Sequence, residues 1–264
     1  MNNNIMYTIK MGKSFCFVNQ KGGVGKTTST INIGAYLAEL GRSVLLVDFD
    51  SQSNLSSGVG ISAEISKPGI YELISGLAAT DEAIRSTPVS GLSVIPANID
   101  LSGAAVELID QEKRDFFLAK VLEPLKSRYD FILIDCPPSL GVLTLNGITA
   151  ADAVLIPMQC EYFAMEGLSH LLQTVKRVQD SLNPALKIEG IFFTMYDSRT
   201  RLAQQVMKEV GSYFKDKVFS TVIPRNVRLS EAPSHGLPIS VYDPQCLGAK
   251  AYKSLAQEIL DRGN

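Results

Sequence analysis

The residues best suited to chemistry lie in one glycine-rich stretch near the start of the chain. An apolar run ending at Val18 leads into Lys-Gly-Gly-Val-Gly-Lys-Thr-Thr, residues 21–28, and a helical pattern follows. This arrangement lets backbone N–H groups and a helix N-terminus converge on phosphate oxygens. Lys26 is placed to reach β- and γ-phosphates, and the Thr27 hydroxyl is placed to bind Mg²⁺, as in a P-loop. The stretch therefore predicts a nucleotide site.

The stretch also departs from the strict P-loop pattern. Five residues before Gly25 the chain has Gln20, where the pattern requires glycine, and a second lysine, Lys21, lies five residues before Lys26. A lone lysine in a glycine loop is often only solvated. Because Lys26 and Mg²⁺ already serve the phosphates of their own subunit, Lys21 is placed to reach a phosphate bound in a second subunit. There it would act as an arginine finger does.

Three aspartates lie where apolar, strand-like runs end. Asp48 and Asp50 follow the run that begins at Ser43, and Asp135 ends the run 131–135. In open parallel sheets the ligand binds beyond the carboxyl ends of the strands. We therefore expect Asp135 to be a Walker-B acid near Mg²⁺. Asp48 and Asp50 alternate along an extended segment and should face opposite ways, so that one reaches the metal or the P-loop while the other addresses water.

The rest of the chain alternates strand-like and helical patterns, which predicts the elements that position these residues. The expected fold is α/β, a single-domain P-loop NTPase with a mostly parallel twisted sheet and helices on both faces. The expected strands are 14–18, 43–48, 92–96, 131–135, 153–157, 188–194 and 218–223. The expected helices are 26–40, 70–75, 81–86, 101–109, 115–127 and 247–260, with a polar loop at 50–60. Gly41 is the expected stop of the first helix.

Composition narrows the class of protein. A chain of 264 residues that is 45% hydrophobic can bury a full core, and its formal net charge of −2 gives no overall attraction to nucleic acid or anionic membrane. Any such binding must come from a local basic patch. Four scattered cysteines favour reduced thiols over disulfides or a zinc site. No signal peptide or membrane span is indicated, so we expect a cytoplasmic protein without membrane attachment.

Four motifs in order along the chain carry a resemblance to a known family. They are K-G-G-V-G-K-T-T, V-D-F-D-S-Q, F-I-L-I-D-C-P-P-S-L-G and V-I-P-R-N-V-R-L-S-E-A-P-S-H-G-L-P-I. From about Ser14 to Leu260 the chain resembles the ParA/Soj family of DNA-segregation ATPases, the deviant-Walker-A class. We accordingly divide it into an N-terminal extension, residues 1–13, and a deviant-Walker-A ATPase domain, residues 14–264. The resemblance implies ATP and Mg²⁺ as cofactors and an ATP-dependent sandwich homodimer in which Lys21 crosses to the partner's nucleotide.

The resemblance also assigns roles to individual residues. It implies catalytic roles for Lys21, Lys26 and Asp50, with Asp50 positioning the attacking water. Thr27 would bind Mg²⁺, with Asp48 and Asp135 supporting the metal shell. The implied nucleotide-binding residues are Lys21, Gly22, Gly23, Val24, Gly25, Lys26, Thr27, Thr28, Pro224 and Asn226. The chain departs from the family at Ser51, where proline is usual, and at Cys246, where serine is usual. Loss of the proline is expected to loosen the catalytic loop.

Basic residues gather in the last third of the chain, and most of them fit a solvated face. By the resemblance, Arg199 and Arg228 match arginines that contact the DNA backbone without sequence preference. We therefore expect ATP-dependent, salt-sensitive binding to non-specific double-stranded DNA, and association with the nucleoid. About a dozen residues precede the first strand, too few for a helix-turn-helix, so operator-specific reading is not expected. The resemblance further implies a ParB-type centromere-binding protein that stimulates slow ATP hydrolysis.

Rival classes share parts of this pattern. A MinD-like membrane-associated ATPase has the same lysine pair, but the last helix here mixes lysines with Glu258 and Asp261 and lacks the basic enrichment that anionic lipid requires. An iron–sulfur reductase subunit would need a second ligand near Cys136, and none is evident in the sequence. A nicotinamide-binding fold is disfavoured because Thr28 stands where a small residue is required. No N-K-x-D motif supports a GTPase.

Overall fold

The structure is a computed structural model that describes residues 11–108 and 110–262. Across these residues seven strands form one sheet in the order β3-β4-β2-β5-β1-β6-β7. They are β1 (Lys13–Phe17), β2 (Val44–Asp48), β3 (Arg85–Ser86), β4 (Leu92–Ile95), β5 (Phe131–Asp135), β6 (Ala153–Gln159) and β7 (Lys187–Thr194). Every pair is parallel except β3 with β4. The predicted mostly parallel sheet is therefore confirmed.

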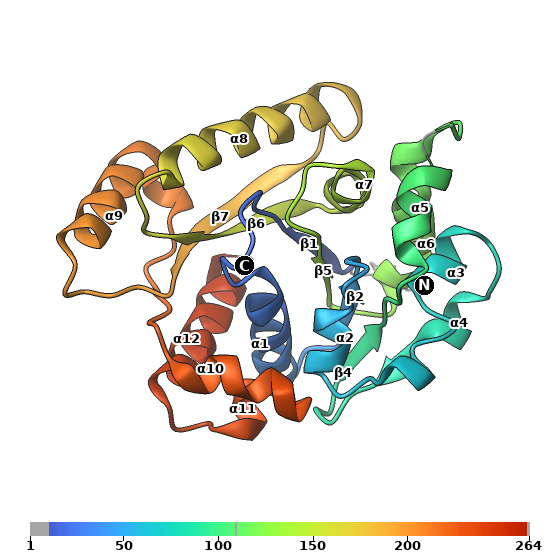
Figure 1. The fold of residues 1–264 in the computed structure, drawn as a ribbon, viewed down its shortest axis with the longest axis horizontal. Coiled ribbons are helices and arrows are strands. Elements are labelled where there is room, and N and C mark those ends of the chain that lie inside the picture. Colours follow the sequence, from blue (N-terminus) through green and yellow to red (C-terminus); the bar gives the residue numbers. More distant parts are fainter. Residues whose placement is uncertain (1–10, 109, 263–264) are drawn as a thin grey trace, which may run out of the picture.

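Twelve α-helices among the described residues connect and cover the strands. They are α1 (Lys26–Glu39), α2 (Asn54–Gly58), α3 (Ile70–Ile74), α4 (Thr80–Ala83), α5 (Leu101–Glu107), α6 (Phe117–Leu122), α7 (Val142–Ala150), α8 (Ala164–Ser181), α9 (Arg201–Phe214), α10 (Val227–Glu231), α11 (Ile239–Tyr242) and α12 (Leu247–Arg262). Figure 1 shows α1 and α12 side by side, with α7, α8 and α9 around the opposite part of the sheet.

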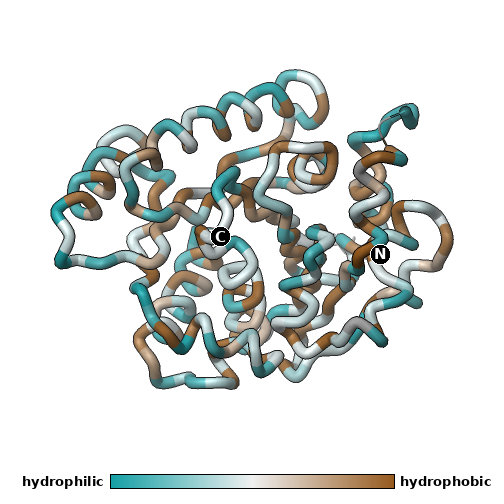
Figure 2. Tube along the Cα trace, viewed as in Figure 1, coloured by the Kyte–Doolittle hydropathy of each residue, from teal (hydrophilic) through white to brown (hydrophobic). Residues whose placement is uncertain are grey.

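The two faces of the sheet bury two separate cores. Leu45 and Val47 of β2 pack into one core with residues of α7 and α8, whereas Val44 and Leu46 pack into the other with residues of α1 and α12. This alternation is what a strand buried on both faces requires. Figure 2 shows many hydrophobic residues along the central strands. The expectation of helices on both faces is confirmed.

Helix α1, which follows the glycine-rich stretch, is buried along most of its length. Every residue from Ser29 to Ala38 is buried between the sheet and α12. A Cβ on Gly34 would come within 2.6 Å of Leu46 Cδ2, so glycine lets the helix lie directly on β2. The helix ends as predicted, because Gly41 takes a left-handed φ of 82° just beyond it. The site's central helix is thus fixed in position.

Three local expectations are wrong. Residues 218–223 touch β7 only at isolated points, where Phe219 and Ile223 donate their N–H groups to carbonyls of that strand. They form no strand, because Ser220 and Thr221 between them donate to the Glu258 carboxylate of α12. The helix expected at 81–86 ends at Ala83, and the chain then turns extended into β3. The loop expected at 50–60 contains α2. Of the predicted N-terminal extension, residues 1–10 lie outside the described residues.

Candidate nucleotide and magnesium site

The glycine-rich loop folds into a cradle at the N-terminus of α1. Gly23 and Gly25 have φ values of 72° and 85°, which only glycine adopts without strain. Gly25 lies directly before α1, whose first turn carries no acidic residue. The positive end of the helix dipole therefore opens into a pocket of 490 Å³ that Gly23, Gly25, Lys26 and Thr27 help to line. Such a cradle suits the phosphates of a nucleotide.

Side chains from the ends of two strands hold this loop in place. Thr194 of β7 donates its hydroxyl to Val24 O at 2.8 Å, and Gln159 of β6 donates its amide to Gly23 O at 3.1 Å. Asn19 donates its amide to Pro157 O at 2.8 Å. The loop is therefore pre-organised by residues more than 130 positions away in sequence. Sequence reasoning missed Gln159 and Thr194, whose one signal is their place at strand ends.

Lys26 points inward, as predicted for the phosphate-binding lysine. Its residue is only 7% exposed, and its ammonium group donates to Lys21 O at 3.4 Å. Burial lowers the pKa of Lys26, while the charges of Asp135 and Asp50 act in the opposite direction. The ammonium group is therefore partly dehydrated, which strengthens its attraction to phosphate oxygens.

Thr27 and Asp135 meet beneath the loop, as predicted. The Thr27 hydroxyl donates to Asp135 Oδ2 at 2.6 Å, and the parallel register sets Asp135 beside both Phe17 and Asp48. Burial, together with the charge of Asp48, raises the pKa of Asp135 to about 8. A cation would compensate the charge of this buried carboxylate, so a hard cation such as Mg²⁺ fits the oxygen donors here. Among the residues described, no cluster of three metal-binding side chains is found. Phosphate oxygens and water would therefore have to complete its shell.

Asp48 is buried, and both of its carboxylate oxygens accept hydrogen bonds from the protein. Oδ2 accepts from the N–H of Ser56 at 2.8 Å and from its hydroxyl at 2.6 Å, and Oδ1 accepts from Asp50 N at 3.3 Å. Burial raises the pKa of Asp48 to about 6, although the bonds from Ser56 oppose the shift. Asp48 thus anchors the loop that follows β2. Its implied part in the metal shell stays a prediction.

Asp50 lies on that loop and is only half-buried. Its Oδ1 accepts from Gln52 N at 3.1 Å, and its carbonyl oxygen accepts from Ser53 N at 2.9 Å, so the segment forms a tight turn. Asp48 is enclosed whereas Asp50 retains access to water, as the alternation of the two residues predicted. Asp50 also lies close enough for its charge to raise the pKa values of Lys26 and Asp135. It is therefore near the phosphate cradle and open to solvent.

A second pocket, of 300 Å³, adjoins the phosphate cradle. Pro224 and Asn226 line it, and it shares Gly25, Thr28 and Met195 with the cradle. The fold thus brings Pro224 and Asn226 beside the glycine-rich loop, in a position suited to a nucleotide base. Met195 was missed in the sequence. It has a left-handed φ of 49°, which is uncommon for a side chain of its size and occurs at functional sites.

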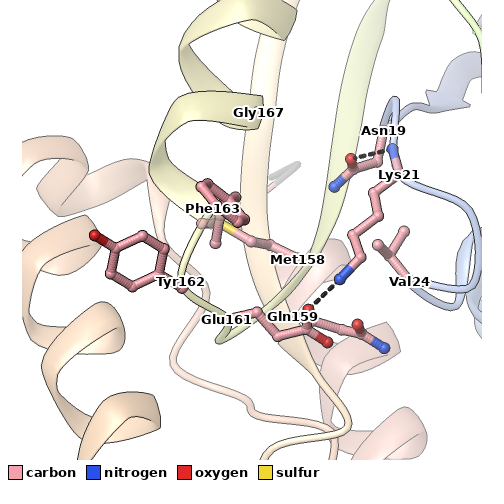
Figure 3. A pocket seen from close by; sticks show the side chains of 10 residues that line it. Asn19, Lys21, Val24, Met158, Gln159, Glu161, Tyr162, Phe163 and Gly167 are labelled. Carbon is pink, nitrogen blue, oxygen red and sulfur yellow. Dashed lines mark hydrogen bonds and ion pairs between the residues drawn. The ribbon is translucent and has the colours of Figure 1, made fainter.

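Lys21 is exposed on the outer lip of the loop, away from the pocket that Lys26 lines. Its N–H donates to Asn19 Oδ1 at 3.0 Å, and its ammonium group forms an ion pair with Glu161. Figure 3 shows this pair beside a pocket that Val24 and Met158 also line. The partner Glu161 was not anticipated from the sequence. The implied role of Lys21 across a subunit boundary stays a prediction.

The two arginines singled out for DNA binding are exposed and already paired with acids. Arg199 forms two hydrogen bonds to Asp197, at 2.8 and 2.7 Å. Arg228 pairs with Glu231 at 2.8 Å and with Asp243 at 3.4 Å. A backbone bridge between Tyr196 and Pro224 joins the two segments that carry these arginines. Both therefore lie near the pocket that Pro224 and Asn226 line.

Cys136 has a cysteine neighbour that the sequence did not reveal. Its Sγ lies 3.3 Å from Cys16 Sγ, and both residues are at most 1% exposed. Burial on this scale leaves no face of either thiol for a cluster shared between subunits. The pair therefore fits a role in packing beneath the loop and gives no support to the iron–sulfur alternative.

Comparisons with known proteins agree with this geometry. The family described as an AAA domain matches residues 12–188. The chain is 64% identical to the chromosome-partitioning ATPase Soj of Treponema pallidum over 252 residues, which covers 96% of this chain and 98% of that protein. It is 54% identical to the sporulation initiation inhibitor protein Soj of Bacillus subtilis, covering 96% and 100%. A solved cobyrinic acid a,c-diamide synthase from Mycobacterium smegmatis, with bound ATP analogue and magnesium, is similar with a TM-score of 0.84, 38% identity and 96% of each chain covered.

Proposed function

The chain belongs to the Soj/ParA family of chromosome-partitioning ATPases, and on that premise we propose that it is an ATP-controlled DNA-binding switch. ATP brings two copies face to face, the dimer binds DNA without sequence preference, and hydrolysis separates the copies and releases the DNA. One observation carries the proposal. Lys26 occupies the phosphate cradle from inside, whereas Lys21 lies on the exposed lip, where a phosphate held by a second copy can reach it.

In this proposal, different residues of the site bind the nucleotide, hold the metal ion and assist hydrolysis. The loop N–H groups, Lys26 and Thr28 bind the phosphates, and Pro224 and Asn226 hold the base. Thr27 and Asp135 would hold Mg²⁺, which neutralises charge on the phosphate oxygens when it is bound. Asp50 orients the attacking water from its half-buried turn. Lys21 of the second copy adds positive charge on the open side, so that efficient hydrolysis requires the dimer.

Binding to DNA follows from the arginines beside the base pocket. Arg199 and Arg228 are exposed guanidinium groups on joined segments, and DNA phosphates can replace their carboxylate partners. A dimer doubles this set of cations, which compensates for the weakly acidic net charge of the chain. Such contacts read no bases, so the complex would associate with the nucleoid at large. A ParB-type partner would accelerate the slow intrinsic hydrolysis.

The membrane-binding alternative of the MinD type is less well supported by the last helix. Tyr252, Leu255 and Ile259, the apolar face of α12, are at most 1% exposed and pack in the core that contains α1. That face is therefore occupied by the protein itself. Within the described residues no helix is long and apolar enough to cross a membrane. The Soj relatives are also more similar in sequence than the solved MinD of Pyrococcus horikoshii, which is 27% identical, so the proposal follows them.

A gel shift with random-sequence duplex DNA tests the proposal directly. The protein should retard DNA with ATP but not with ADP or without nucleotide, and retardation should fall steeply with salt. Lys21→Ala should still bind ATP as a monomer but form no dimer, because the contact across the interface is lost. Asp50→Ala should accumulate as an ATP dimer on DNA, because hydrolysis is blocked. If Asp50→Ala stays monomeric in size-exclusion chromatography at saturating ATP, the switch mechanism is wrong.

A further inference from the structure

The lysine that the dimer needs is engaged within its own chain. The Lys21 ammonium group pairs with the Glu161 carboxylate, and the two side chains are 53% and 55% exposed. Figure 3 shows the Lys21 side chain extending along the pocket toward Glu161. Both groups are half-exposed, so neither is trapped there by burial. The pair can open without disturbing the core.

The backbone on both sides of this ion pair is held firmly. Asn19 ties the start of the loop to β6 through Pro157 O, and Gln159 ties Gly23 to the end of the same strand. Glu161 lies two residues beyond Gln159 and donates its N–H to Gln159 O at 3.0 Å, so the backbone that carries the carboxylate is held opposite Lys21. A long, flexible lysine side chain would otherwise sample many rotamers in water. The ion pair with Glu161 therefore favours one of these Lys21 rotamers.

An exposed aromatic pair directly follows Glu161. Tyr162 and Phe163 are 78% and 70% exposed, and their rings meet edge to face at 5.0 Å between centroids. Large apolar side chains exposed together are typical of a surface that another protein covers. This surface adjoins Lys21, the residue proposed to cross to a second copy. The occupant that fits both features is therefore a second copy of this chain.

We propose that Glu161 is a latch that holds Lys21 on its own subunit and so sets the threshold for dimerisation. The inference rests on the proposed function, because it assumes that Lys21 serves the partner's nucleotide. In the proposed latch the lysine leaves Glu161 before it reaches across the interface, so each protomer opens its latch before the dimer closes. Glu161 is thus a positioning residue that acts through Lys21.

The expected size of the effect follows from the exposure of the ion pair. An exposed ion pair changes an equilibrium by at most about fivefold, and a symmetric dimer opens two of them. Glu161→Gln should therefore lower the dissociation constant of the dimer by roughly 2- to 25-fold. The effect should fade at high salt, because salt screens exposed charges. A change in general stability would not show this dependence on salt.

Sedimentation velocity across a protein concentration series, with a non-hydrolysable ATP analogue and Mg²⁺, measures this constant. Glu166→Gln is the matched control, because Glu166 is an exposed acid on α8, five residues away, for which the structure gives no ion pair. The latch predicts tighter dimerisation for Glu161→Gln alone, at low salt. If the wild type dimerises and Glu161→Gln dimerises equally or more weakly, the latch is refuted.

A second measurement needs no nucleotide and no dimer. In the nucleotide-free protein, Glu161→Gln should increase the rate at which an amine-reactive ester labels Lys21, read by peptide mass spectrometry, whereas Glu166→Gln should leave it unchanged. Unchanged labelling of Lys21 would overturn the latch. Should labelling rise while neither the wild type nor any variant dimerises with the analogue, Glu161 does hold Lys21 on its own chain, but the proposed dimer switch fails.

Discussion

Rising pH should destabilise the metal-free protein through one buried group, Asp135. Its carboxyl is 1% exposed, and burial together with the charge of Asp48 raises its pKa from 3.8 to about 8. Between these two values the folded protein keeps a proton that the unfolded chain has lost. The free energy of unfolding must therefore fall as pH rises through this window and level off above about pH 8.

The magnitude follows from the width of the window. Each pH unit within it lowers the free energy of unfolding by about 1.4 kcal/mol, so the loss between about pH 5 and pH 7 is about 2.7 kcal/mol from Asp135 alone. In a chain of this length, that corresponds to a fall of roughly 5–10 °C in the melting temperature. Asp48, whose pKa is raised to about 6, adds a smaller loss that ends near that pH.

Thermal unfolding in EDTA at a series of pH values, for the wild type and for Asp135→Asn, isolates the effect. Asparagine keeps an acceptor for the Thr27 hydroxyl but cannot ionise, so the variant should lose less stability with pH. Excess MgADP should flatten the wild-type slope, because a bound cation favours the charged carboxylate. Parallel curves for the two proteins in EDTA would refute the reasoning, since burial would then hold no proton on Asp135.

Three further changes test other parts of the structure. Asp197→Asn should strengthen ATP-dependent DNA binding about two- to fivefold in a low-salt gel shift, because the Asp197 carboxylate then no longer competes with DNA phosphates for Arg199. Weaker binding would show instead that Asp197 positions the arginine. Gly147→Ala should lower the free energy of unfolding in urea by about 1–3 kcal/mol, because a Cβ would lie 2.4 Å from Cys136 Sγ. Adding Cys136→Ala should restore much of this stability, and additive losses in the double variant would contradict the explanation. Asn226→Ala should weaken nucleotide binding about tenfold by calorimetry, and unchanged affinity would place the base elsewhere.

The parts of the fold predicted correctly are those that a local pattern specifies. The apolar run ending at Asp135, the glycines around Lys26 and the stop at Gly41 each carry their structural consequence within a few residues. The alternation of such runs was enough to predict a mostly parallel sheet, and parallel sheets gather ligand residues at one edge. The meeting of Thr27 and Asp135 could therefore be predicted without knowledge of the strand order.

The missed features depend on contacts between distant parts of the chain. Nothing near residues 218–223 shows that Glu258 accepts two of their N–H groups, so their apolar pattern alone predicts a strand. Glu161 is 140 positions from Lys21, and Gln159 is 136 from Gly23. Such pairings exist only once the sheet has formed, so sequence spacing carries no signal for them.

The bond between Asp48 and Ser56 has a consequence for the chain between them. Ser56 Oγ also accepts from Ala97 N at 3.1 Å, so the far end of this short segment is tied to β2 and to the region after β4. A short segment held at both ends can adopt few backbone conformations. The absence of proline at Ser51 should therefore loosen this segment less than it would loosen an open loop. Asp50, the residue proposed to position water, is thus held near the phosphate cradle even without nucleotide.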